Sequence, residues 1–541
     1  MHLSLAMKTH RFPALQSTPR CLALTAASLL TVITADAQLI DRTLAPNPAN
    51  EGIAKSYAAE IGAGRGDVFT PGSSAYIIAR DPFRSVRRGR QLFQRKFTRA
   101  NGLGPLAGDG IGDVSTNLAI GAGLSDSCAS CHGRPRGSAG FGGDVTTRPD
   151  SRDAPHLFGL GLKEMLADEI TTELRAIRAA AIALAQSSGQ SVTKPLTSKG
   201  IQYGSITVAA NGSVNTSAVD GVDADLRVKP FFFHGGTISI REFVIGALND
   251  EMGLQAFDPT LAAAKAGGRV VTPTGMVLDG ALDPINAPRP TSATDDPDGD
   301  GVVNEVPQSI VDHFEFYLLN YFKPGTHTEG QDKQILAGRR MFELVGCARC
   351  HIPDLTIEHD RRVADVETVF DGERGIFNGL FATATPLINA VDDGSGHPAL
   401  KQPKNGRFVV KNILTDFKRH DLGPRFHERN YDGTMRTHLL TTPLWGVGST
   451  APYGHDGRSI NLNEVILRHG GEAQPEAEAY ARLGRGNRNL LLDYLNSLVI
   501  FPPDDTASNL NPGNRADPKF PQSGHGSLKL GALFNDPNDP E

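Results

Sequence analysis

Two short motifs in the chain combine a pair of cysteines with a histidine at the spacing of covalent haem attachment. They are Cys128-Ala-Ser-Cys131-His132 and Cys347-Ala-Arg-Cys350-His351. In such a motif the two thiols form thioethers along one haem edge, and the adjacent histidine ligates the iron. Together the motifs contain every cysteine of the chain except Cys21. The sequence therefore predicts two covalently bound c-type haems.

Three other uses of these cysteines are weaker. A four-cysteine zinc site would have to bring together two pairs that lie far apart in the sequence, and it would leave both histidines unexplained. A thioredoxin-like dithiol needs a βαβ context, which neither pair has. Two small disulfide loops would again give the histidines no role.

The first residues resemble an export signal. Lys8, Arg11 and Arg20 are basic, residues 21–35 are apolar, and Ala35-Asp36-Ala37 fits a cleavage site before Gln38. The apolar run is too short to span a bilayer, so we expect no membrane span in the mature form. A retained N-terminal anchor is the alternative. We therefore expect a periplasmic protein that has lost Cys21.

Composition sets the broad class. Charged residues make up 21% of the 541 residues and hydrophobic residues 39%, as in ordinary globular proteins. The net charge of −6 gives no basic surface for nucleic acid, which we exclude as a partner. A chain of this length is expected to form more than one domain.

Several segments have the apolar spacing of helices and could position the two motifs. They are residues 85–95, 161–187, 238–249, 308–321, 331–345 and 487–498, and a β-like pair lies at 201–208 and 212–219. A helix that runs directly into a Cys-x-x-Cys-His motif suits the small cytochrome c domain. The expected fold is therefore mainly α, with two cytochrome c-like haem domains, long loops and a small β insertion.

Changes in composition suggest the boundaries between these parts. We expect a signal peptide (1–37), an N-terminal extension (38–84), a first haem domain (85–290) with an insertion (190–228), a connector (291–325), a second haem domain (326–500) and a tail (501–541).

The second half of the chain also resembles a known family. The stretches TTPLWGVG (441–448), APYGHDGR (451–458) and NLNEVILRHGGEA (461–473) are similar to the di-haem oxidoreductases, relatives of the bacterial di-haem cytochrome c peroxidases. Supporting segments are SCASCHGRPRG (127–137), DAPHLFGLGLKEML (153–166), LNDEMG (248–253) and HDLG (420–423). The resemblance implies that the C-terminal haem relays electrons and that the N-terminal haem reacts with peroxide.

The resemblance also suggests a sixth ligand for the second haem. The family position lies fourteen residues after the histidine of the His-Asp-Gly motif, which is His455 here, and this leads to His469. Classical peroxidases have methionine there, and one relative has tyrosine. Histidine would give a lower reduction potential than methionine. The alternative role of His469 is a favourable interaction with the helix dipole at the C-terminus of its helix. The alternative ligand is Met435.

The sixth position of the first haem is unassigned. Classical relatives carry a histidine where this chain has Val145, and no histidine lies between His132 and His156. Either the haem has an open face, as a peroxide-binding haem requires, or His156 or His234 is the ligand.

Peroxide cleavage also needs an acid–base group. In relatives a glutamate before Met-Gly has this role, and here Glu251, with Asp250 beside it, precedes Met252-Gly253. Two acids at a helix end could equally be solvated. The tryptophan that lies between the haems in relatives aligns with Phe233, and the one tryptophan of this chain, Trp445, is expected to be a packing wall.

Two further sites are predicted outside the motifs. Arg134 and Arg136 follow the first motif and could pair with haem propionates, although a solvated loop would look the same. Asp296, Asp298, Asp300 and Asn304 have the spacing of a calcium loop, but Pro307 stands where such a loop has glutamate. A calcium site and a plain acidic linker both fit this spacing.

Taken together, these features predict an exported di-haem peroxidase that takes electrons from a small soluble donor, such as a cytochrome c or a copper protein. Two alternatives remain open: a plain electron-transfer cytochrome, and oxygenase-like oxidation of an organic substrate.

Overall fold

The structure is a computed structural model that describes residues 56–97, 125–133, 154–288, 290–297, 299, 301–321, 333–367, 383–430 and 433–498. The predicted signal peptide, the start of the N-terminal extension and the predicted tail lie outside these residues. So do five candidate site residues, which are Arg134, Arg136, Val145, Asp298 and Asp300. Within the described part, no helix has both the length and the apolar character needed to cross a membrane.

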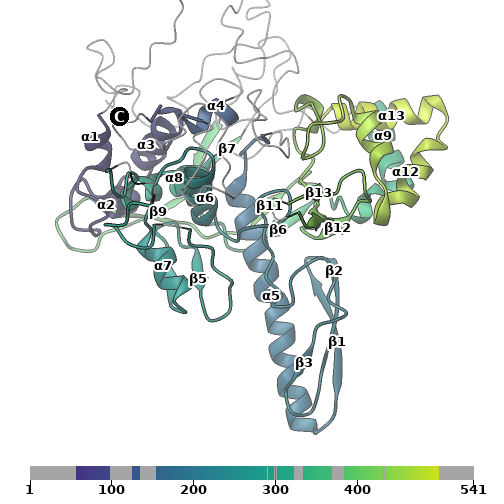
Figure 1. Cartoon of the computed structure of the whole chain (residues 1–541), viewed down its shortest axis with the longest axis horizontal. Helices are drawn as coiled ribbons and strands as arrows, with labels where there is room; N and C mark the ends of the chain where they lie inside the picture. Colours follow the sequence, from purple (N-terminus) through teal and green to yellow (C-terminus); the bar gives the residue numbers. More distant parts are fainter. Residues whose placement is uncertain are drawn as a thin grey trace, which may run out of the picture. The chain divides into compact units, whose positions relative to one another are not determined.

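The first group of helices surrounds an apolar core (Figure 1). Leu92, Ile245 and Phe314 come from three of these helices and are at most 1% exposed. The predicted helices at 85–95, 161–187, 238–249 and 308–321 are confirmed. The helices are α1 (Tyr57–Ile61), α2 (Ser74–Arg80), α3 (Pro82–Gln94), α4 (Cys128–His132), α5 (Leu160–Ser188), α6 (Ile240–Asp250), α7 (Pro259–Lys265) and α8 (Gln308–Asn320).

A second group of helices has its own core, in which Phe342, Leu491 and Tyr494 are buried. The helices predicted at 331–345 and 487–498 are confirmed as the first and last of this group. Its members are α9 (Lys333–Val345), α11 (Leu462–Arg468), α12 (Gln474–Ala481) and α13 (Arg485–Asn496), with short 3₁₀ helices at Cys347–Arg349, Val447–Ser449 and Gly471–Ala473.

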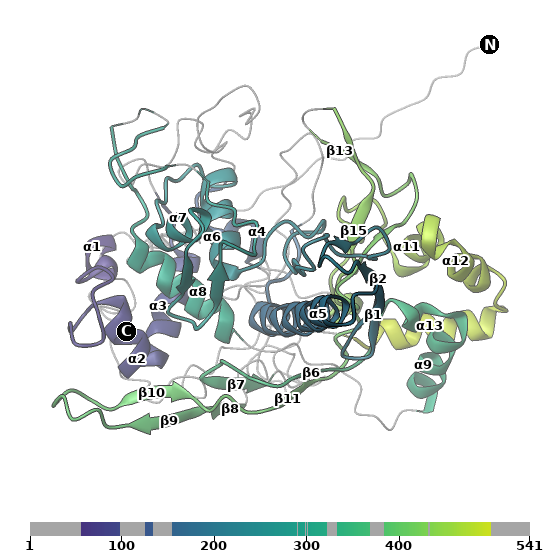
Figure 2. The same cartoon turned by 90° about the horizontal axis from the view of Figure 1, so that it is seen from below.

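Antiparallel sheets fill much of the rest of the described chain: one has three strands and six have two. Figure 2 shows one such pair, β9 and β10, as a two-stranded ribbon. The strands are β1 (Val192–Ser198), β2 (Ile201–Val208), β3 (Val214–Asn215), β4 (Arg269–Val271), β5 (Val277–Asp279), β6 (Leu355–Ile357), β7 (Ala364–Glu367), β8 (Thr383–Pro386), β9 (Ile388–Val391), β10 (Leu400–Pro403), β11 (Phe408–Val410), β12 (Arg419–Asp421), β13 (Glu428–Arg429), β14 (Met435–Arg436) and β15 (His438–Leu440).

The predicted fold class is wrong. The sequence was expected to give a mainly α chain of two cytochrome c-like domains, but the described residues form a mixed fold with many small sheets and show no such pair of domains. The strands beyond residue 350 have two to four residues each. A strand that short has almost no alternation of apolar and polar residues, and alternation is the signal by which a strand is recognised.

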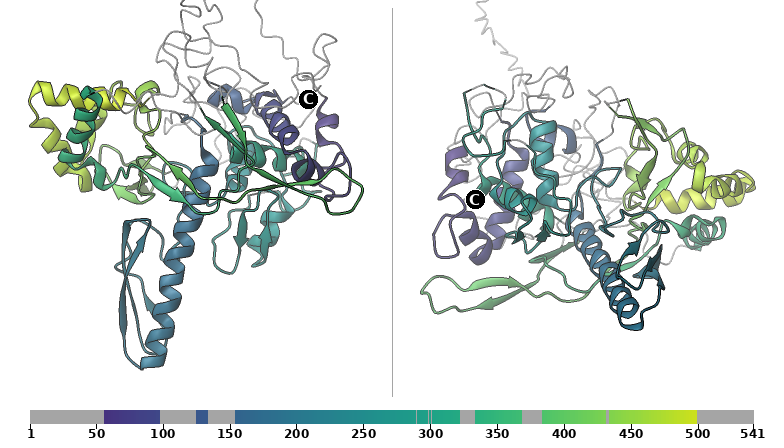
Figure 3. Two further views of the ribbon diagram at one scale, coloured as in Figure 1. Left: turned by 180° about the vertical axis from the view of Figure 1, so that it is seen from behind. Right: turned by 60° about the horizontal axis from the view of Figure 1, so that its bottom comes forward.

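The predicted β insertion is present, with one more strand than expected. β1 and β2 form a hairpin that lies along α5, and β3 continues the sheet (Figure 3). Leu196, Tyr203 and Ile206 of the hairpin are fully buried in the same core as Ala181 and Ala185 of α5. The hairpin therefore covers the apolar side of the C-terminal half of the helix.

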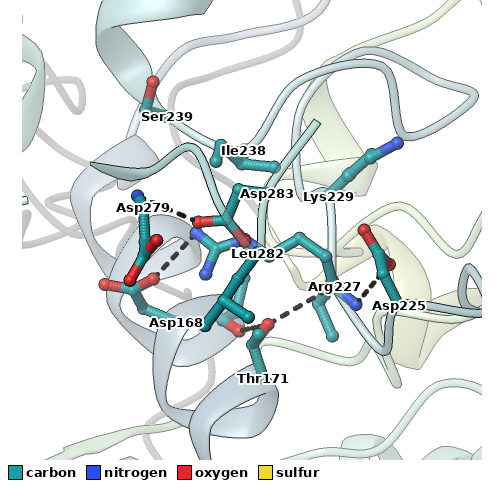
Figure 4. A network of polar contacts seen from close by, with 12 residues as sticks. Asp168, Thr171, Asp225, Arg227, Lys229, Ile238, Ser239, Asp279, Leu282 and Asp283 are labelled. Atoms are coloured by element: carbon teal, nitrogen blue, oxygen red, sulfur yellow. Dashed lines mark hydrogen bonds and ion pairs between the residues drawn. The ribbon is translucent and has the colours of Figure 1, made fainter. Parts of the chain in front are cut away.

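A polar network ties α5 to the last residues of the insertion (Figure 4). Arg227 Nη2 donates to Asp168 Oδ1 at 2.8 Å, and the Val228 amide donates to Thr171 Oγ1 at 3.0 Å. The Arg227 side chain is 4% exposed. Phe231, Phe232 and Phe233 follow a few residues later in the chain, so this network anchors the segment that carries them.

Candidate haem-binding site

Both Cys-x-x-Cys-His motifs border one continuous cavity of ≈ 790 Å³. The four cysteines and two histidines of the motifs all line it, although the motifs are far apart in the sequence. Most other lining side chains are apolar, among them Phe93, Leu318, Phe342 and Leu491. A large apolar cavity with few polar groups is typical of a cofactor site.

The motif histidines are oriented as iron ligands should be. His132 Nδ1 donates to the Pro155 carbonyl at 2.7 Å, and His351 Nδ1 donates to the Leu414 carbonyl at 3.0 Å. A metal-bound histidine usually donates its second ring N–H to a carbonyl in this way, which leaves Nε2 for the metal. Burial also lowers the pKa of His351 to about 4, so its ring is neutral, as ligation requires. These residues fit haem.

The cysteines do not fit a zinc site. A structural zinc site needs four ligands within bonding distance of one ion. Among the described residues, the one cluster with metal-ligand spacing is Cys350, Asp416 and His420, which contains a single cysteine. His420 also contacts Glu472, with 2.7 Å between Nδ1 and Oε2.

His469 reaches the cavity from the end of α11. Its Nδ1 donates to the Val465 carbonyl at 2.7 Å, which leaves Nε2 for a metal. The Phe426 ring packs edge-on against it, with 5.3 Å between ring centroids. Burial lowers the pKa of His469, and this histidine is close enough to His351 to lower the pKa of His351 in turn. Met435, the alternative ligand, is 53% exposed on β14 and does not border the cavity.

An ion pair fixes the end of α11 in place. Arg468, the residue before His469, donates from Nη1 to Asp456 Oδ1 at 2.8 Å, and its guanidinium lies 4.2 Å from the centroid of the Phe426 ring. Asp456 belongs to the His-Asp-Gly motif. The motif that suggested His469 from the sequence therefore also holds the helix that carries it.

The structure distinguishes between the candidate acid–base residues and between the candidate ligands of the first haem. Glu251, at the C-terminus of α6, borders the cavity, whereas Asp250 is exposed and does not. His156 also borders it: its Nε2 donates to the Trp445 carbonyl at 3.1 Å, and within the described residues its Nδ1 has no hydrogen-bond partner. His234 instead lines a separate, open pocket of ≈ 280 Å³.

Aromatic residues from distant parts of the sequence line the cavity. Phe233 stacks on His455 with 4.6 Å between ring centroids and 10° between planes. The Leu440 amide of β15 donates to the Phe233 carbonyl at 2.8 Å, which joins the two halves of the site. Trp445 is 3% exposed and packs in the core around α5 while bordering the cavity, as a packing wall would.

Lys163, His420 and His455 border the cavity, and the sequence interpretation gave none of these three side chains a chemical role. His420 and His455 lie in segments that carried the family resemblance, so their motifs were a usable signal. Lys163 gave no signal, because a lysine on a helix is usually solvated.

The acidic connector is partly described. Asp296 Oδ1 accepts the Gly299 amide at 2.9 Å and Oδ2 accepts the Gly301 amide at 3.0 Å. Asn304 Oδ1 accepts the Phe257 amide at 3.2 Å. These loop contacts occur in an acidic linker as well as in a calcium loop, so calcium stays a prediction.

Comparison with known proteins supports the family. Residues 360–498 match the family model described as "Di-haem oxidoreductase, putative peroxidase". A search among curated proteins gave no match to the chain. The matched residues include His420, His455 and His469 but neither Cys-x-x-Cys-His motif. The match over these residues supports the family predicted from the motifs, and the family name indicates a di-haem oxidoreductase class.

Proposed function

We propose that this chain, whose residues 360–498 belong to the di-haem oxidoreductase family, is a c-type cytochrome that reduces a peroxide. The observation that carries the proposal is that both haem-attachment motifs border one cavity together with Glu251. A carboxyl group beside the first motif supplies the acid–base function that peroxide cleavage needs.

Bound haem would supply the iron that delivers two electrons to the O–O bond of the peroxide. The chain's own contribution is proton transfer and exclusion of water. Glu251 would accept a proton from one peroxide oxygen and return it to the other. Two electrons and two further protons then complete the reduction of hydrogen peroxide to two water molecules. The apolar lining limits water and strengthens each electrostatic contact inside.

Electrons would enter at the second haem from a small soluble donor, a cytochrome c or a copper protein, and pass to the first haem. His351 and His469 would be the two protein ligands of the second haem. The stacked rings of Phe233 and His455 support a packed path, since both line the cavity. The signal-like residues 1–37 support export to the periplasm.

The spin state of each haem tests the proposal. Optical and electron paramagnetic resonance spectra of the purified holoprotein should show a low-spin second haem and, after one-electron reduction, a high-spin first haem that reacts with hydrogen peroxide. A first haem that stays low-spin and ignores peroxide would rule out the peroxidase.

One observation favours a second candidate, a plain electron carrier. His156 borders the cavity with an Nδ1 that has no partner among the described residues. If His156 ligates the first haem, both haems are six-coordinate and no substrate can bind. Changing His156 to alanine would then convert the first haem from low-spin to high-spin, whereas in the peroxidase it leaves the spin state unchanged.

A further inference from the structure

Lys163 places an ammonium group against the cavity, and no carboxylate of the described residues pairs with it. The residue lies in the first turns of α5 and borders the cavity. Its Nζ is 5.6 Å from the centroid of the Phe231 ring. Among the described residues, neither a carboxylate nor any other hydrogen-bond acceptor contacts this nitrogen. Desolvation by the surrounding side chains lowers the pKa of Lys163 to about 8.

Some other partly buried lysines of the described chain form ion pairs. Lys199, which is 7% exposed, donates to Glu169 Oε2 at 2.6 Å, and Lys229, which is 19% exposed, lies 2.7 Å from Asp223. Glu164, the sequence neighbour of Lys163, is oriented toward Arg361 instead, at 2.8 Å. Lys163 has no such carboxylate partner among the described residues, and its ammonium lies against the Phe231 ring.

The carboxylates that line the cavity leave Lys163 unpaired. Glu472 contacts His420, and Glu476 forms an ion pair with Arg349. Glu251 also borders the cavity but forms no ion pair with Lys163. A cation in an apolar site is costly unless an anion accompanies it. We therefore expect the ligand that fills the cavity to carry an anionic group close to Lys163.

Lys163 lies on the side of the first motif. The pKa of His156 is lowered to about 3, mainly by burial, and the nearby Lys163 and His132 both contribute to this lowering. The anionic groups of a haem are its two propionate carboxylates. We propose that the Lys163 ammonium binds a propionate of the haem attached at Cys128–His132. The inference rests on the proposed function only in that the cavity holds this haem.

The chemistry of the pair agrees with the site. A lysine–carboxylate contact of about 2.8 Å restores the charge balance that the cavity lacks. Lysine is a point charge on a flexible four-carbon stem, so it can follow the propionate along the cavity wall. The Phe231 ring would remain against the ammonium and shield the pair from water.

The test compares the holoprotein variants Lys163→Met and Lys265→Met. Lys265 is an exposed lysine of α7 whose Nζ donates to the Ala287 carbonyl at 2.9 Å, so it controls for the loss of one positive charge. Redox titration with optical detection should show a lower potential for the first haem in Lys163→Met, because a nearby cation favours the reduced form. The second haem, and both haems of Lys265→Met, should keep their potentials.

Thermal unfolding gives an independent measurement. Methionine matches the volume of lysine, so Lys163→Met should fold. If the ammonium binds a propionate, the variant unfolds at a lower temperature than the wild type. If it has no partner, removing a buried charge raises that temperature, and the proposal is overturned.

Two other outcomes overturn the proposal in distinguishable ways. An unchanged potential of the first haem would show that no propionate lies beside Lys163. A low-spin to high-spin change in Lys163→Met would make the amine an iron ligand instead. A pyridine haemochrome assay that counts one haem per chain would contradict the proposed function itself, not only the role of Lys163.

Discussion

At the scale of single residues, the structure separates two neighbouring acids that the sequence could not. Glu251 borders the cavity, whereas Asp250 is exposed to solvent. We expect Glu251→Gln to lower the rate of peroxide reduction by roughly 10²- to 10⁴-fold, because glutamine cannot carry the proton. Steady-state assays with a reduced donor measure this. Asp250→Asn is the matched control and should retain the wild-type rate, and equal losses in both variants would contradict the assignment.

His469 supports a second prediction at this scale. Its Nδ1 is held by the Val465 carbonyl, so only Nε2 can ligate iron. Methionine is a weaker donor to ferric iron, and His469→Met should raise the reduction potential of the second haem and leave the first unchanged. Spectroelectrochemistry measures both. Met435→Leu should change neither, since Met435 is 53% exposed on β14. A shifted potential in that control would reopen Met435 as the ligand.

At the scale of elements, long helices were predictable and short strands were not. α5 has 29 residues and α8 has 13, enough for several apolar repeats. β12 and β15 have three residues each and form only by pairing with each other. The haem motifs could be read because their five residues are contiguous. The meeting of Glu251, Lys163 and His469 at one cavity depends on tertiary packing, which a local pattern does not contain.

The contact between α9 and α13 permits a test of that packing. A Cβ added at Gly338 of α9 would lie 2.0 Å from the Leu490 carbonyl oxygen and 2.8 Å from Tyr494 Cβ of α13. Gly338→Ala should therefore destabilise the protein by about 1–3 kcal/mol, because the helices must move apart. Gly486→Ala, in an exposed turn of α13 where a Cβ meets nothing within 4 Å, is the control and should be neutral or stabilise by ~0.5–1 kcal/mol. Urea denaturation gives both values, and similar losses would contradict the close approach of the helices.

At the scale of the whole molecule, one buried carboxyl connects three separate segments. Glu164 of α5 accepts the Ile240 amide at the start of α6 at 2.8 Å and the Arg361 guanidinium at 2.8 Å. Its side chain is 0% exposed. Burial raises the pKa of Glu164 to about 7 against the opposing pull of Arg361. Arg361 lies within the family-matched residues, so this contact joins them to the helices that carry the first half of the site.

The raised pKa makes stability depend on pH in a definite direction. Between the unfolded pKa of 4.5 and the folded value of about 7, the folded state holds a proton that the unfolded state has lost. Stability must then fall as pH rises through this window, by up to about 3 kcal/mol. Glu164→Gln removes the titration, so the free energy of unfolding of the wild type relative to this variant should decline from pH 4.5 to 7 and be level outside that range. Glu173→Gln, on the same helix with a 44% exposed side chain, is the control and should follow the wild type. Parallel curves for the wild type and Glu164→Gln in urea denaturation would show that Arg361 keeps the carboxyl ionised, and that the two halves are joined by a permanent ion pair.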